Sequence, residues 1–305
     1  MEKFDIGLAY VWEYDKEFID LLEQRLQNAG LTTYIIGDHN LYEAAEKIAG
    51  KEMSFRFYLD RAWDVEENYE EFGKMLMKRK TIILNGYKYV THAIDKATMH
   101  LEFITNGINV PYSIIIPPKS QHADVYISVS DLAHLGRPFI IKPCNTTGGG
   151  TGVVTGAESL DEILDERHTF GDDKYILQEK IYPTYLGDKR AWFRCFWAFG
   201  KPIPTWWDDT NHRYSILTED EFDRFALKKL FSITKKIASL TALDFFSTEI
   251  ALCTSGKFIS IDYINDQCDM RLQSSHFDGV PNEIAEAIID NLIKYIKRIK
   301  KTKKL

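Results

Sequence analysis

The first ninety residues alternate short apolar runs with longer segments in which apolar residues recur every three or four positions. The short runs predict buried strands and the longer segments predict amphipathic helices, two of which stop at Gly30 and Gly50. Strands are expected at residues 6–11, 32–36, 55–59 and 81–84, and helices at 18–29, 41–48 and 69–77. This alternation is typical of a parallel sheet with helices on both faces. Residues 1–89 are therefore predicted to form a doubly wound α/β domain.

Beyond residue 90 strands and helices no longer alternate regularly. Helices are predicted at residues 92–106, 130–135, 159–166, 219–242 and 282–299, and strands at 108–116, 139–141, 175–181, 190–199, 202–207, 246–252 and 257–264. Ser159 followed by Glu162 is the signature of a capping box, and Thr254-Ser-Gly256 predicts a hairpin turn. We divide this part into two lobes of mixed α and β structure, residues 90–182 and 183–305.

Composition and charge narrow the class of protein. The chain has 305 residues, of which 45% are hydrophobic and 27% charged, as in ordinary globular proteins. A formal net charge of -7 argues against nucleic acid as the main partner, because proteins that bind phosphate backbones usually carry a basic face. No apolar run reaches the roughly 18 residues of a membrane span. The four cysteines form no C-x-x-C pair, and we see no signal peptide, so a cytoplasmic protein with reduced thiols is expected, with a homodimer as the default assembly.

A glycine-rich stretch at residues 138–156 carries the first candidate chemistry. An apolar strand delivers Lys142 at its end, and Gly148, Gly149, Gly150 and Thr151 follow. Glycines let successive backbone N–H groups approach a ligand and form a nest for an anion, and the lysine adds a compact positive charge. A simple glycine-rich hairpin with a surface lysine is the alternative. The two commonest nucleotide-loop signatures, G-x-x-x-x-G-K-[ST] and G-x-G-x-x-G, do not match this stretch.

Carboxylates near the C-terminus form the second candidate. Glu249 lies inside an apolar strand, and Asp262, Asn265, Asp266 and Asp269 gather at the end of the next strand. If the two strands pair, alternation sends the first two acids to one face and creates an oxygen-rich site suited to Mg²⁺. Ordinary acids at a solvated strand end are the alternative. A carboxylate within an apolar strand is costly without a cation or a hydrogen-bonding partner.

With these parts in order, the chain resembles the ATP-grasp superfamily from about residue 84 to residue 290. The resemblance rests on a succession of motifs: Asp95-Lys96 before Gly107-Ile-Asn-Val-Pro111, Phe139-Ile-Ile-Lys-Pro143 with its glycine run, Ile176-Leu-Gln-Glu-Lys-Ile181, Gly187-Asp-Lys-Arg190, and Glu249 with Ile261-Asp-Tyr-Ile-Asn265. It implies a two-lobed α+β ATP-grasp domain after the doubly wound leader, with ATP and Mg²⁺ as cofactors.

The resemblance also implies roles for individual residues. Those that would contact ATP are Lys96, Lys142, Gly148, Gly149, Gly150, Thr151, Gln178, Glu179, Lys180, Ile181 and Arg190, and those that would hold Mg²⁺ are Glu249, Asp262 and Asn265. One departure concerns the metal set. The family commonly spaces its last acid and asparagine by two residues, whereas here they are three apart. Either a bulge restores the geometry or Asp266 replaces a ligand.

Most members of the superfamily activate a carboxylate as an acyl phosphate, which an amine then attacks. We therefore expect a ligase that joins a small-molecule carboxylate to an amine, acting on a small amino acid or peptide-like substrate, with Lys142, Arg190 and Arg271 as catalytic residues. Arg194, Arg213 and Arg271 are candidates for clamping a substrate carboxylate, because a guanidinium can make two parallel hydrogen bonds to one. A kinase acting on a polyol or inositol phosphate and a non-catalytic nucleotide-binding protein are the alternatives.

Overall fold

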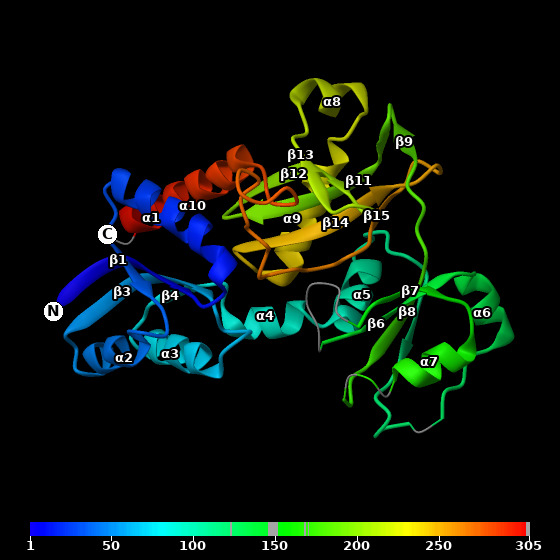
Figure 1. Ribbon diagram of the computed structural model, residues 1–305, viewed down its shortest axis with the longest axis horizontal. Coiled ribbons are helices and arrows are strands. Elements are labelled where there is room, and N and C mark those ends of the chain that lie inside the picture. The colour runs from blue at the N-terminus through cyan, green and yellow to red at the C-terminus, as the bar shows by residue number, and fades with distance from the viewer. Residues whose placement is uncertain (123, 146–151, 168, 170, 303–305) are drawn as a thin grey trace.

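The computed structural model describes residues 1–122, 124–145, 152–167, 169 and 171–302. Within these residues the strands form a four-stranded parallel sheet, a four-stranded antiparallel sheet, a five-stranded antiparallel sheet and a two-stranded ribbon (Figure 1). The predicted class is confirmed, because a doubly wound α/β domain precedes two lobes that are each built on an antiparallel sheet.

The first domain is built on the parallel sheet, in the order β2-β1-β3-β4. Its elements are β1 (Glu2–Tyr10), the 3-10 turn η1 (Glu13–Asp15), α1 (Lys16–Asn28), β2 (Thr33–Ile36), α2 (Leu41–Ala49), β3 (Met53–Arg61), α3 (Glu67–Lys78) and β4 (Ile82–Leu84). Figure 1 shows α2 and α3 on one face of the sheet and α1 on the other, and two separate apolar clusters fill the two interfaces. The strands and helices expected from the hydrophobic pattern of this domain are all confirmed.

The last helix of the chain, α10 (Asn282–Thr302), packs beside α1 on the first domain (Figure 1). Arg25 of α1 bonds Glu286 at 2.9 Å and Asp290 at 2.7 Å. The apolar side of α10 joins one cluster with the β1 and β3 side chains. This helix therefore completes the helical layer over a sheet that lies at the opposite end of the sequence.

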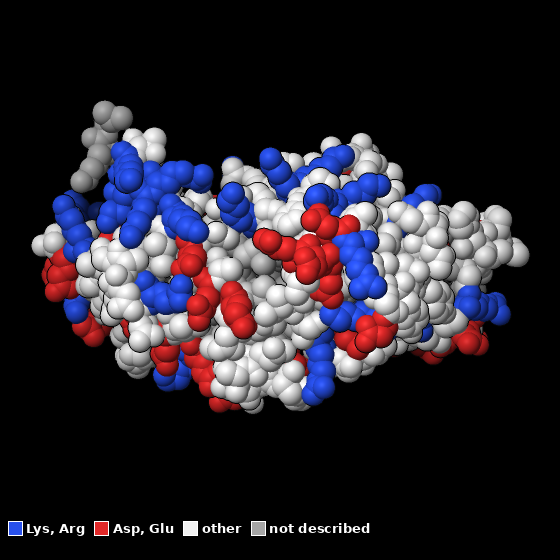
Figure 2. Space-filling view, turned by 90° about the horizontal axis from the view of Figure 1, so that it is seen from above, with Lys and Arg blue, Asp and Glu red and all other residues white. Residues whose placement is uncertain are grey.

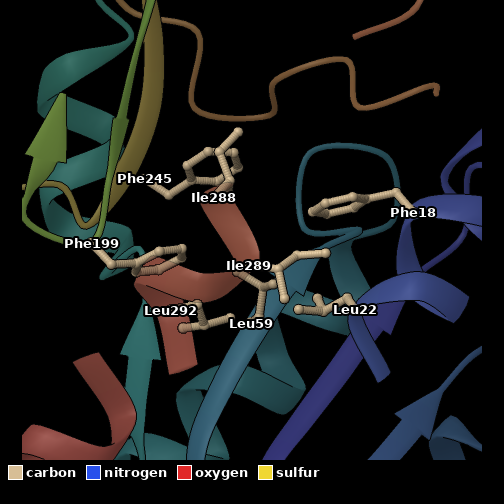
Figure 3. A pocket seen from close by; sticks show the side chains of 8 residues that line it. All are labelled: Phe18, Leu22, Leu59, Phe199, Phe245, Ile288, Ile289 and Leu292. Carbon is tan, nitrogen blue, oxygen red and sulfur yellow. The ribbon is translucent and has the colours of Figure 1, made fainter. Parts of the chain in front are cut away.

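A small apolar void lies where the first domain, α10 and the third lobe meet. Its volume is about 10 Å³, which is at the lower limit for holding a water molecule. Figure 3 shows the side chains around it, which are those of Phe18, Leu22, Leu59, Phe199, Phe245, Ile288, Ile289 and Leu292. Because the lining is entirely apolar, the void is a packing gap in the shared core rather than a ligand site.

The second lobe is built on the antiparallel sheet β5-β8-β6-β7. Its elements are α4 (Tyr87–Ala93), α5 (Lys96–Thr105), β5 (Ser113–Ile116), α6 (Val129–Leu135), β6 (Phe139–Pro143), β7 (Val154–Ala157), α7 (Leu160–Glu166) and β8 (Tyr175–Glu179). The predicted capping box of Ser159 and Glu162 is present at the start of α7. The helix expected at 92–106 is present as α5, but its expected start is wrong, because Asp95 leaves the helical conformation and caps α5 through the N–H groups of Ala97 and Thr98.

The third lobe is built on the five-stranded sheet β13-β12-β11-β14-β15. Its elements are β9 (Tyr185–Leu186), β10 (Lys189–Arg190), β11 (Trp192–Ala198), β12 (Lys201–Asp208), β13 (Arg213–Ser215), α8 (Glu219–Arg224), α9 (Lys229–Thr241), β14 (Phe245–Leu252) and β15 (Phe258–Ser260). The single helix expected at 219–242 is wrong. Ala226 takes a φ of +54°, which ends α8 and separates it from α9. The predicted hairpin between β14 and β15 is confirmed.

Lys and Arg side chains gather at the end of the molecule where α10 ends (Figure 2). Lys300 and Lys301 lie in the last described turn, where the helix dipole favours positive charge. Among the described helices, none combines the length and the apolar composition that crossing a bilayer requires.

Candidate functional site

Two lysines of the second lobe are brought together by adjoining elements. Lys142 is the fourth residue of β6 and pairs with Ile176 of β8. Lys96 is the first residue of α5, and its backbone N–H donates to the carbonyl oxygen of Cys144 at 3.2 Å. This bond ties the start of α5 to the end of β6. Both lysine side chains are half-buried, so neither is an ordinary solvated surface charge.

The strand that carries the candidate metal ligands is irregular beyond β15. Ile250 pairs with Ser260 in the regular hairpin, whereas Ser247 bridges to Asn265. The two partners on β14 are three positions apart and those on the second strand are five positions apart, so the second strand carries two extra residues. Such an insertion is a bulge, a device that re-aims side chains next to functional sites.

Glu249 lies opposite the bulge. Its carbonyl oxygen accepts from the N–H of Ile261 at 2.8 Å, and its own N–H donates to the carbonyl oxygen of Asp262 at 2.9 Å. One residue of β14 thus faces two successive residues of the neighbouring strand. The three-residue spacing of Asp262 and Asn265 is therefore accompanied by a bulge, the first of the two alternatives that the sequence left open.

The lysines and the carboxylates converge across the space between the two lobes. Burial lowers the pKa of Lys142, and the charges of Asp262 and Glu249 raise it. The charge of Lys96 also lowers it, and the net result is a pKa below the ordinary value for lysine. Interactions of this kind require the groups to be near one another. Two cations of the second lobe therefore lie near two anions of the third lobe.

A half-buried arginine holds Glu249 in place. Arg194 on β11 lies directly across from Glu249 on β14 and forms an ion pair with it. The indole N–H of Trp192 donates to the other carboxylate oxygen at 2.9 Å, and the Arg194 guanidinium lies 4.4 Å from the ring centre of Trp207. Burial lowers the pKa of Arg194, but the charges of Tyr214, Glu249 and others outweigh it, so the pKa lies above its ordinary value. Arg194 is thus a positioning residue for Glu249.

A buried hydrogen-bonded triad joins the two lobes behind the charged groups. Tyr263 lies in the bulge, and its hydroxyl oxygen accepts from Nε2 of Gln178 on β8 at 2.8 Å. Nδ1 of His100 on α5 lies 2.5 Å from the same oxygen. Burial lowers the pKa of His100 to about 4, so the ring is neutral near pH 7 and its Nδ1 accepts the tyrosine proton. Neither His100 nor Tyr263 was among the residues that the sequence motifs indicated.

We expect Tyr263→Phe to lower the free energy of unfolding by about 1–3 kcal/mol, because it leaves the Gln178 amide and the His100 nitrogen buried without a partner. Denaturant titration measures this. The control is Tyr112→Phe, the same chemical change at a hydroxyl that bonds Asp131 at 3.2 Å in the second lobe alone. If both variants lost the same small amount, the triad would contribute nothing to stability.

The depressed pKa of His100 predicts a dependence of stability on pH. Unfolded His titrates near 6.5 and folded His100 near 4, so the unfolded chain binds the proton first. Its contribution is complete above pH 6.5, declines as the pH falls, and amounts to roughly 3 kcal/mol lost below pH 4. Asp60, whose pKa burial raises to about 6, acts in the opposite direction. The measurement is therefore the difference between wild type and His100→Gln, in which the contribution of Asp60 cancels; a difference independent of pH would contradict the prediction.

The residues predicted to hold adenine lie at the end of β8 and just beyond it. The Glu179 carboxylate accepts from the backbone N–H of Tyr112 at 2.7 Å, which fixes the edge of the sheet at β5. Lys180 is exposed and lies 5.9 Å from the ring centre of Tyr182, whereas Ile181 is half-buried. The Gln178 side chain is engaged with Tyr263, and the backbone N–H of Glu179 donates to the carbonyl oxygen of Tyr112 at 2.9 Å, so neither of these groups is available to a base.

Two predicted catalytic arginines are paired with carboxylates. Arg190 on β10 makes two parallel bonds to Asp209, at 2.7 and 2.8 Å. Arg271 bonds Asp269 through Nε and a terminal nitrogen, at 2.9 and 2.7 Å, and also bonds Asp278 at 2.9 Å. A contact of either guanidinium with a substrate through these same two nitrogens would require it to exchange one of these partners.

The remaining predicted residues are Asp266 and the glycine-rich stretch. Asp266 is buried and accepts from the indole N–H of Trp63 at 3.2 Å, so its side chain faces the first domain. Burial and the charge of Asp64 raise its pKa to about 7. Gly148, Gly149, Gly150 and Thr151, predicted to cover the phosphates, lie outside the described residues.

Known protein structures share this architecture, although sequence comparison finds no relative. No protein-family model matches the sequence, and no curated protein sequence does either. The structure is similar to D-alanine–D-alanine ligase from Bacillus anthracis in complex with ATP, with a TM-score of 0.64 at 14% identity over 99% of both chains. The chain has the ATP-grasp fold.

Two further structures share the ATP-grasp fold with this chain. A RimK domain protein from Sphaerobacter thermophilus gives a TM-score of 0.61 at 15% identity and covers 95% of this chain and 98% of its own. The ATP-grasp ligase PsnB, complexed with minimal precursor, Mg and ADP, gives a TM-score of 0.59 at 14% identity over 94% and 98% of the two chains. At these identities the likeness establishes the fold.

The side chains at the candidate metal position of this ATP-grasp fold fit a hard cation. Glu249, Asp262 and Asn265 offer two carboxylates and an amide oxygen, the donor types that Mg²⁺ selects. In the part of the chain that the structure describes, no group of three or more His, Cys, Asp or Glu side chains could hold a metal ion. Mg²⁺ itself is usually held by one or two carboxylates together with water and substrate phosphates, without a closed protein cage.

Proposed function

We propose that the chain is an ATP- and Mg²⁺-dependent ligase that activates a carboxylate as an acyl phosphate and joins it to an amine. The observation that supports this most directly is the convergence of Lys96 and Lys142 from one lobe with Glu249 and Asp262 from the other, within an ATP-grasp fold. The solved structures add support, since one is a ligase complexed with ATP and another a ligase complexed with Mg and ADP.

In this proposal Lys96 and Lys142 bind the phosphates of ATP. Burial and the charge of Lys96 both disfavour the charged form of Lys142, so an anion between the two lysines would relieve an existing cost. The glycines at 148–150 and Thr151 are proposed to add backbone N–H groups to the same phosphates. The backbone of residues 179–181 would line the adenine.

Glu249, Asp262 and Asn265 are proposed to hold Mg²⁺. The cation would offset charge on the phosphate oxygens that the lysines alone do not neutralise. Arg194 and Trp192 orient the Glu249 carboxylate from behind, and the bulge sets the position of Asp262. Binding of the metal would therefore depend on Trp192 and Arg194 of β11 as well as on the three proposed ligands.

The proposed reaction has two steps. An oxygen of the substrate carboxylate attacks the γ-phosphorus of ATP, ADP leaves, and an acyl phosphate forms. The amine then attacks the acyl carbon, phosphate leaves, and the amine loses a proton. The described residues need supply no covalent nucleophile, because catalysis of phosphoryl transfer consists mainly of positioning and charge stabilisation.

Arg190 and Arg271 are proposed to assist these steps by exchanging a carboxylate partner for a substrate. Arg271 follows the metal-binding segment directly and is held by Asp269 and Asp278, so a substrate carboxylate would take the place of one of these acids. Arg190 would exchange Asp209 for a phosphate in the same way. A small amino acid or peptide-like molecule, with a carboxylate and an amine in its chemistry, is the proposed substrate class.

The test follows ADP and free phosphate together in Mg²⁺-ATP with pooled amino acids, amines and cell-extract metabolites. The proposal expects equal amounts of both products, released only when substrates are present and lost in Lys142→Ala. ADP without matching phosphate would mean that the phosphoryl group stayed on an acceptor, and a kinase would replace the ligase. Equal release from Lys142→Ala would place the chemistry elsewhere.

A further inference from the structure

A concave site lies beside α9, and none of its lining residues belongs to the candidate site described above. The hollow has a volume of about 330 Å³ and is bounded by the segment after α5, one side of α9 and the turn between β14 and β15. Its lining residues are Gly107, Ile108, Asn109, Lys229, Ser232, Ile233, Lys236, Gly256, Lys257 and Phe258. The volume is at the lower end of the range for small-molecule sites.

Three lysines and no acidic residue line this hollow. Lys229 and Lys236 stand two turns apart on one side of α9, and Lys257 reaches it from the hairpin turn. Among the described residues, none of the three makes an ion pair with a carboxylate, whereas their neighbour Lys228 pairs with Asp223 at 2.8 Å. Like charges gathered without a counter-ion repel one another.

Only one of the three lysines has a stabilising contact in the described part of the local structure. The Nζ atom of Lys236 lies against Gly107, just beyond the C-terminal end of α5, where the helix dipole favours a cation. No comparable partner is present in the described chain for Lys229 or Lys257. The chain has a net charge of -7 and therefore more acidic than basic side chains, yet among the described residues no acidic side chain lines this hollow.

We propose that this hollow binds a small molecule that carries two or more phosphate charges. Lysine ammonium groups act as compact point charges that suit phosphate, whereas carboxylates are more often recognised by the planar fork of arginine, which the hollow lacks. Ser232 and Asn109 also line the hollow, but the Ser232 hydroxyl donates to the carbonyl oxygen of Lys229 and the Asn109 amide to that of Phe258, so the lysines are the groups that would hold the anion. The site lies where the second and third lobes meet, and none of its lining residues is among those proposed to bind the nucleotide or the metal.

Inorganic pyrophosphate is a suitable probe, and calorimetric titration without Mg²⁺ measures its affinity. The experiment uses the full chain carrying Lys142→Ala, so that the proposed nucleotide site does not contribute. One variant of this chain carries the hollow changes, which are Lys229→Gln, Lys236→Gln and Lys257→Gln. The other variant carries the control changes, which are Lys201→Gln, Lys228→Gln and Lys235→Gln. Both sets remove three positive charges from exposed positions of the same lobe.

We expect the hollow changes to weaken pyrophosphate binding at least tenfold, and the control changes to weaken it less than twofold. Equal weakening by both sets would mean that net charge alone attracts the anion, and the proposal would be overturned. Absence of binding to the Lys142→Ala chain would overturn it as well. If instead the wild type had no ligase activity while the hollow changes still abolished binding, the ligase proposal would fail and this one would stand.

Discussion

Lys142→Ala is expected to weaken binding of Mg²⁺-ATP by about ten- to a hundredfold, the loss expected when a charged partner of a phosphate is removed. Stability is expected to stay the same or to increase. The lowered pKa of Lys142 means that folding disfavours its charged form, so removal of the charge removes a cost that is present at neutral pH. Calorimetric titration with a non-hydrolysable ATP analogue measures the affinity, and urea titration measures the stability.

Lys201→Ala is the control for this prediction, because Lys201 is an exposed lysine at the start of β12, in the other lobe. It should leave the affinity unchanged. Unchanged affinity in both variants would remove Lys142 from the nucleotide site, whereas a loss of affinity accompanied by unfolding would make Lys142 a structural residue.

Arg61→Ala is expected to lower the free energy of unfolding by about 3–5 kcal/mol, the largest stability effect that we predict. Arg61 bonds both carboxylate oxygens of Asp15 at 2.8 Å and the carbonyl oxygen of Cys268 at 2.8 Å, and both charged side chains are almost fully buried. The substitution leaves Asp15 as a buried charge without its partner. It also cuts the bond that ties the first domain to the segment after the candidate metal ligands.

A double variant separates these causes. Arg61→Met with Asp15→Leu replaces the pair by apolar side chains, and a large part of the lost stability should return, because no uncompensated charge remains. Thermal and denaturant unfolding of the single and double variants provide the comparison. A double variant as unstable as Arg61→Ala would show that the bond to Cys268, and not the unpaired Asp15, accounts for the loss.

The first domain could be predicted almost entirely from the sequence, because its strands and helices follow simple apolar periodicities. The two helices whose predicted bounds are wrong share a different cause. In each, the apolar pattern continues through a point where the backbone turns, at Asp95 and at Ala226, and periodicity alone carries no signal of that turn. A capping aspartate was the one available indication, since Asp95 precedes the helix that it caps.

The candidate site was predictable only in part. Lys142 and Glu249 stand out because each interrupts an apolar strand, and the resemblance to a known fold supplies the order of the remaining motifs. Tyr263 and His100 carry no comparable signal, because their roles depend on two lobes meeting. The pairing of Arg194 with Glu249 depends on the register of β11 and β14, which spacing along the chain does not determine.

The central claim is that the chain transfers the γ-phosphoryl group of ATP to a carboxylate. The most direct measurement supplies pooled amino acids and peptides labelled with ¹⁸O in their carboxylates, with Mg²⁺-ATP, and determines the isotope content of the released phosphate by mass spectrometry. We expect one ¹⁸O atom in each phosphate released with ADP, because the carboxylate oxygen that attacks phosphorus stays on the phosphate when the amine displaces it. ADP accompanied by unlabelled phosphate, or by a phosphorylated product that retains the phosphoryl group, would contradict the account.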